Sequence, residues 1–61
     1  MVVIITKQIK FVSANTRLLY DVLPDTPVEI IGETANGDKL GRLLTRNDIV
    51  GPVKEGNYKM Y

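Results

Sequence analysis

Apolar and polar residues alternate through residues 28–44, where two extended runs flank an Asn-Gly pair. A period of two is the pattern of a β-strand with one buried face. Asn36-Gly37 predicts a two-residue type I′ turn between the two strands, because both central residues of that turn adopt positive φ. We therefore predict a β-hairpin, and its register decides which side chains share a face.

In this register Gly32 lies opposite Gly41, and paired glycines in a sheet suit a sharp bend or a close approach of two backbones. Val28 and Ile30 share one face of the hairpin. On the other face, Arg42 lies within reach of the glutamates of the neighbouring strand. That outward face carries the candidate protein-binding residues Glu29, Ile31, Glu33, Arg42 and Leu44.

Residues 2–12 contain no turn-forming residue after the apolar start. We expect them to form one long, bent strand, with Val3, Ile5 and Phe11 on the same face. The first half of this strand is apolar on both faces, as in a central strand of a sheet.

Residues 17–23 fit either a short helix or a strand. Asn15 or Thr16 could cap a helix, apolar residues would share one side of it, and Pro24 would end it. We prefer the helix on these grounds and keep the strand as the alternative. The stretch Pro24-Asp25-Thr26-Pro27 then forms a turn that leads into the hairpin.

These elements predict a mainly β fold, either a small, strongly bent sheet or an SH3-like barrel of about five strands. It holds at most one short helix, at residues 17–23. We expect residues 1–61 to form a single small domain, in which residues 54–61 are a frayed tail or an edge strand. The similarity to SH3-like barrels rests on the turn-rich strand order and the glycine-bent hairpin. Such barrels host unrelated functions, so the similarity implies a fold and no activity.

The composition excludes several kinds of catalytic and metal-binding site. The chain has no Cys and no His, which excludes disulfides, zinc sites of the usual kind and histidine general bases. Asp21 and Asp25 are separated by Pro24 and are expected to be solvated carboxylates rather than a catalytic pair. We therefore expect a non-enzyme without a metal or cofactor. Because so small a domain has marginal stability, we also expect a homodimer or larger homo-oligomer.

The apolar start of the chain, residues 1–5, is too short to cross a bilayer and lacks the positive charge that precedes a signal peptide. A buried strand explains it, and we expect a cytoplasmic protein.

Charge is unevenly distributed. Residues 1–17 carry three cations and no acid, residues 18–38 carry five acids and no base, and residues 39–61 carry five cations and two acids. Neutralisation between neighbouring strands explains this pattern. The alternative is one basic face that contacts nucleic-acid phosphates. Its candidate residues are Lys7, Lys10, Arg17, Arg46 and Lys54.

Two further stretches are similar to known families. Residues 8–30 resemble the swapped-hairpin DNA-binding domain of AbrB- and MazE-type antitoxins, in the order strand, short helix, proline turn and hairpin. That resemblance implies a dimer that binds nucleic acid through Lys7, Lys10 and Arg17. Residues 39–50 look like the closing stretch of a CBS motif, and residues 12–18 are similar to its opening. That resemblance implies a nucleotide-binding unit in which Thr45 and Asp48 contact ribose or phosphate.

We expect a small protein-interaction module with a regulatory or inhibitory role, from a microbe or a mobile element. Recognition would use the outward hairpin face or an edge strand. The alternatives are a dimeric DNA- or RNA-binding regulator and, third, a degenerate CBS-like nucleotide-binding unit.

Overall fold

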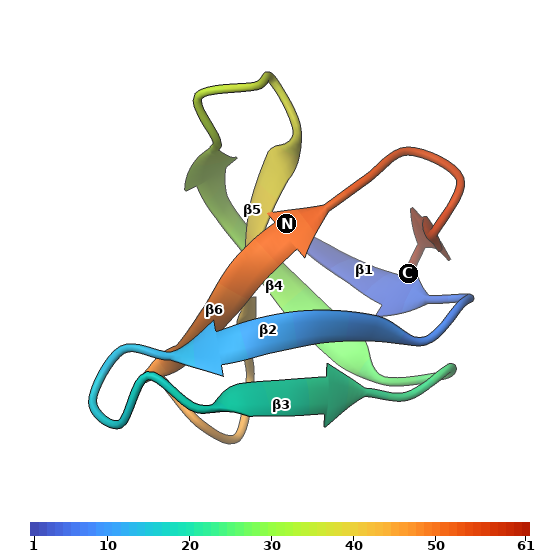
Figure 1. Ribbon diagram of the computed structural model, residues 1–61. Helices are drawn as coiled ribbons and strands as arrows, with labels where there is room; N and C mark the ends of the chain where they lie inside the picture. Colours follow the sequence, from blue (N-terminus) through green and yellow to red (C-terminus); the bar gives the residue numbers. More distant parts are fainter.

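The computed structural model describes all residues, 1–61, and contains seven β-strands and no helix. The strands are β1 (Val2–Ile5), β2 (Ile9–Ser13), β3 (Leu19–Val22), β4 (Pro27–Glu33), β5 (Lys39–Leu43), β6 (Ile49–Val53) and β7 (Tyr58–Met60). They form one antiparallel sheet in the order β3-β2-β6-β5-β4-β1-β7. The sheet curls around its own core as a half-barrel (Figure 1). The prediction of a mainly β, strongly bent sheet is confirmed, with seven strands instead of about five.

The expectation of one long strand over residues 2–12 is wrong. β1 lies between β4 and β7, whereas β2 lies between β3 and β6. Ile5 ends β1 by exchanging backbone hydrogen bonds with the β3–β4 turn, accepting from Asp25 N–H (2.7 Å) and donating to Thr26 C=O (3.0 Å). Thr6 N–H donates to Asn57 C=O (2.8 Å). The chain breaks here because its two halves pair with different strands, which no local turn residue signals.

The helix preferred for residues 17–23 is also wrong, and the strand alternative is correct. Arg17 adopts a left-handed conformation (φ 65°), which closes a turn after β2 and cannot start a helix. Ser13 N–H donates to Leu18 C=O (3.0 Å), and β3 then pairs with β2 along its length. Pairing with a neighbouring strand has therefore overridden a weak local preference.

The hairpin between β4 and β5 is present, but its turn differs from the predicted type. Gly37 has positive φ (87°) and Asn36 does not. Thr34 C=O accepts from Gly37 N–H (3.0 Å), and Thr34 N–H donates to Asp38 C=O (2.8 Å). This is the three-residue loop in which a turn is followed by a glycine of positive φ.

The longer loop shifts the register, and a bulge at Ile31 shifts it again. Gly32 pairs with Leu40 and Ile30 pairs with Gly41, so the predicted Gly32–Gly41 pair does not form. On its other side, Gly41 pairs with Gly51 of β6.

Phe11 packs against this glycine pair at the centre of the half-barrel. A Cβ built on Gly51 would lie 2.5 Å from Phe11 Cδ1 and 3.0 Å from its Cα, and one on Gly41 would lie 2.6 Å from Val28 Cγ1. The backbone of β6 thus approaches Phe11, and that of β5 approaches Val28 and Val53, more closely than a side chain at either glycine would permit. The remaining core side chains surround this contact: Val3, Ile5, Val22, Val28, Leu43, Ile49 and Val53.

We predict that Gly51→Ala destabilises the protein by about 1–3 kcal/mol, because the added methyl overpacks the core against Phe11. Gly32→Ala is the matched control, since nothing lies within 4 Å of a Cβ at that position. Urea unfolding followed by circular dichroism measures both. Equal stability of the two variants would show that the close approach at Gly51 is not required.

A second prediction concerns the hairpin loop. Gly37→Val should lower the free energy of unfolding by about 1 kcal/mol or more, because a β-branched residue resists positive φ. The same denaturation assay tests this, and a neutral result would contradict the loop conformation.

Candidate functional site

β3 is an edge strand that pairs only with β2 (Figure 1). Leu18 C=O accepts from Ser13 N–H on the β2 side. In an antiparallel ladder the hydrogen-bonding direction alternates along the strand. Tyr20 and Val22 therefore bond to β2, whereas Leu19 and Asp21 direct their N–H and C=O groups to the free edge. These four groups form a template for a further strand.

The side chains of this edge are unusually apolar. Exposed fractions are 69% for Leu18, 70% for Leu19, 43% for Tyr20 and 56% for Leu23. Natural edge strands are generally protected by charged side chains, proline or a covering element. β3 has one charged residue, Asp21, and its carboxylate is bound by Lys10 Nζ at 2.5 Å. The edge consequently offers both unpaired backbone hydrogen-bonding groups and exposed apolar side chains.

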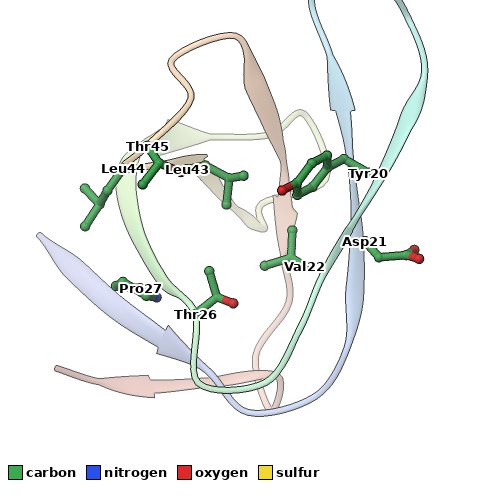
Figure 2. Close-up of a pocket in the computed structure, with 8 residues that line it drawn as sticks. All are labelled: Tyr20, Asp21, Val22, Thr26, Pro27, Leu43, Leu44 and Thr45. Carbon is green, nitrogen blue, oxygen red and sulfur yellow. The ribbon is translucent and has the colours of Figure 1, made fainter.

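A cavity of about 140 Å³ opens beside β3, between this strand, the β3–β4 turn and the end of β5. Figure 2 shows Tyr20 and Val22 on the β3 side and Leu43 across the opening, while the Asp21 carboxylate points away from it. The curl of the sheet brings these strands face to face without hydrogen bonds between them. The full lining is Tyr20, Asp21, Val22, Thr26, Pro27, Leu43, Leu44 and Thr45.

The structure brings two of the five residues of the predicted outward hairpin face into direct contact. Arg42 Nη2 binds Glu29 Oε1 at 2.6 Å, so these two are brought together. Leu44 lies at the cavity beside β3 and is 49% exposed. Ile31 occupies the bulge of β4, and Glu33 pairs with Lys39 towards the tip of the hairpin. Only Leu44 belongs to the apolar edge.

The five candidate nucleic-acid contacts are likewise divided. Arg17 and Arg46 lie in the loops that follow β2 and β5, at one end of the half-barrel. Lys7 precedes β2, at its opposite end, and Lys54 follows β6. The Lys10 ammonium binds the Asp21 carboxylate, and the Arg46 guanidinium binds the Asp48 carboxylate at 3.2 Å. The basic blocks are thus partly neutralised by acids and face different directions.

Asp48 fastens the β5–β6 loop to the end of β2. Ser13 Oγ donates to Asp48 Oδ2 (2.8 Å), and Ala14 N–H donates to the Asp48 backbone C=O (2.7 Å). The hydrogen bond from Ser13, followed by the one from Arg46, lowers the pKa of Asp48 below its ordinary value. The Asp48 carboxylate is hydrogen-bonded to Ser13 and Arg46. The structure also has no helix, which the CBS-like and antitoxin-like resemblances both require.

The chain has no cluster of three or more His, Cys, Asp or Glu residues that could hold a metal ion. It also has no helix of the length and apolar character needed to cross a membrane.

Sequence reasoning missed β3 as the candidate site. Its signal was the apolar stretch Leu18-Leu19-Tyr20, followed after Asp21 by Val22 and Leu23, which places apolar side chains on both faces of a short strand. In the helix that we preferred for residues 17–23, these residues would share a buried side, so their exposure was not expected.

The depressed pKa of Asp48 predicts an acid dependence of stability. A carboxylate with a lowered folded-state pKa stabilises the protein above its unfolded-state pKa of about 4, and this stabilisation is lost as pH falls through the folded-state value. In thermal unfolding from pH 6 to pH 2, Asp48→Asn should lack this part of the acid decline. Ser13→Ala, which removes the largest cause of the shift, should lie between the two curves. Parallel curves for wild type and Asp48→Asn would contradict this role.

Comparison with protein-family models, curated proteins and solved structures finds no match to this chain.

Proposed function

We propose that this protein is a non-enzymatic protein-binding module that takes an extended segment of a partner protein along the free edge of β3. The observation that carries the proposal is that one short strand combines unpaired backbone groups, exposed apolar side chains and an adjoining cavity. Strand addition of this kind gains affinity from main-chain hydrogen bonds and specificity from pockets for alternate side chains.

The backbone supports a short segment. Leu19 and Asp21 each offer one donor and one acceptor, so a docked strand gains up to four hydrogen bonds. Both N–H groups lie on an edge where no internal bond must be broken. A partner in extended conformation therefore binds without unfolding any part of this sheet.

The cavity supports an apolar side chain at one position of that segment. Tyr20, Val22 and Leu43 line it with hydrophobic surface. Its volume of about 140 Å³ is similar to that of an engineered apolar cavity that accepts benzene, about 150 Å³. A leucine-sized or phenylalanine-sized group fits this description, with Leu44 at the rim.

A regulatory or inhibitory role follows from this mode of binding. A small protein that covers an extended segment of its partner withholds that segment from other contacts. The nucleic-acid-binding alternative, through Lys7, Lys10, Arg17, Arg46 and Lys54, stays a prediction that the placement of these residues at both ends of the half-barrel does not favour.

The test selects binders from a displayed library of random decapeptides and measures their affinity by fluorescence anisotropy. Leu19→Pro removes one edge N–H, and proline is tolerated where the N–H faces solvent on an edge strand. We expect peptide affinity to fall ten-fold or more in Leu19→Pro. Leu19→Ala, which keeps the N–H, should lose much less.

Ile31→Glu is the control for the hairpin face and should leave both peptide affinity and melting temperature nearly unchanged. Circular dichroism confirms that each variant is folded. If Ile31→Glu abolished binding while Leu19→Pro did not, the interface would be the hairpin face and the proposal for β3 would be wrong.

A further inference from the structure

We infer that the free edge of β3 also pairs with β3 of a second copy, about a two-fold axis at Tyr20, to form an antiparallel dimer. The dimer rests on β3 and the residues that flank it. Its consequence, that the dimer masks the site for a partner segment, rests on the proposed function.

The free hydrogen-bonding groups select the register. A two-fold axis perpendicular to the sheet places one residue opposite its own copy. With Tyr20 on the axis, Leu19 of each copy lies opposite Asp21 of the other. All four free groups of each edge are then used, and no existing hydrogen bond is broken.

The neighbouring registers fail for identifiable reasons. Centring on Asp21 sets two carboxylates opposite each other, which is destabilising. It also requires Leu23, whose C=O already accepts from Thr26 N–H (3.3 Å). Centring on Leu19 requires Arg17, whose N–H is bound to Ser13 C=O (2.8 Å) and whose φ of 65° is not that of a strand.

Charge complementarity favours antiparallel over parallel pairing of the two edges. β3 is preceded by Arg17 and followed, in the β3–β4 turn, by Asp25, and both side chains are exposed. With Tyr20 on the axis, Arg17 of each copy lies opposite Leu23 of the other, so the basic end of each edge lies towards the acidic end of the other. Asp21 remains bound to Lys10 within its own copy.

The dimer also covers apolar surface that the monomer exposes. The two Tyr20 rings meet near the axis, and Leu18 of each copy lies opposite Val22 of the other, which is already buried in its own core. Tyr20 is 43% exposed and Leu18 is 69% exposed in the monomer. A domain with only eight buried hydrophobic residues has much to gain from this burial.

Single-cysteine variants test the register directly, because the natural chain has no cysteine. Residues opposite each other in a non-hydrogen-bonded antiparallel pair have Cα atoms about 4.5 Å apart, within the range that a disulfide requires. Tyr20→Cys should therefore form a disulfide-linked dimer under mild oxidation. Leu18→Cys is the matched control, because Leu18 lies on the same face and is more exposed than Tyr20, but lies several residues from its own copy in this register. We expect dimer formation at least ten-fold faster for Tyr20→Cys, and equal rates would overturn the register.

Sedimentation equilibrium tests the dimer without cysteine. Wild type and Leu19→Ala should self-associate reversibly, whereas Leu19→Pro should be monomeric at the same concentration with an unchanged circular dichroism spectrum. A monomeric wild type at millimolar concentration would overturn the dimer. A library peptide that binds β3 should dissociate the dimer. A dimer with no peptide binding would leave this inference standing and remove the proposed function, whereas peptide binding to a strictly monomeric protein would do the reverse.

Discussion

The contact of Phe11 with the glycine pair Gly41–Gly51 is the constraint on which the rest of this structure depends. The Phe11 ring occupies space that side chains at these two positions would otherwise fill, since a Cβ would lie 2.5 Å from Phe11 Cδ1 if built on Gly51 and 3.2 Å from Phe11 Cζ if built on Gly41. The sheet must curl to close around that ring, and the core residues of the outer strands then meet above it. A flat sheet of this length would leave the same residues exposed. In so small a chain, the packing of the core therefore depends mainly on the Phe11 ring and on two positions without a side chain, Gly41 and Gly51.

The same curl creates the site. It swings β3 towards the start of β4 and the end of β5 but stops short of hydrogen bonding, so a cavity forms where closure would have completed a barrel. β3 keeps a free edge as a result. Burial changes along β3 accordingly: Val22 is buried in the core, whereas Tyr20 remains 43% exposed. The exposure of apolar side chains at this edge is thus a consequence of incomplete closure.

The sequence was sufficient for the class of fold and for its local turns. Alternation marked β4 and β5, and Pro24-Asp25 marked the turn before them, where Asp25 adopts positive φ (72°). A glycine pair was expected to bend the sheet, but Gly41 meets Gly51 instead of Gly32 because the loop is one residue longer and Ile31 is bulged. The site could not be found in this way, since edge position and exposure depend on which strands pair across the whole chain. Rules that use only the local sequence would assign Leu18 and Leu19 to the core.

Amide hydrogen exchange along β3, measured by NMR in protein dilute enough to be monomeric, tests the central claim that this strand has one free edge. Protection should alternate, with slow exchange at Tyr20 and Val22, which bond to β2, and rates close to those of an unstructured peptide at Leu19 and Asp21. Similar protection of all four amides in the monomer would contradict the account, because it would mean that β3 is paired on both sides and that the half-barrel is closed.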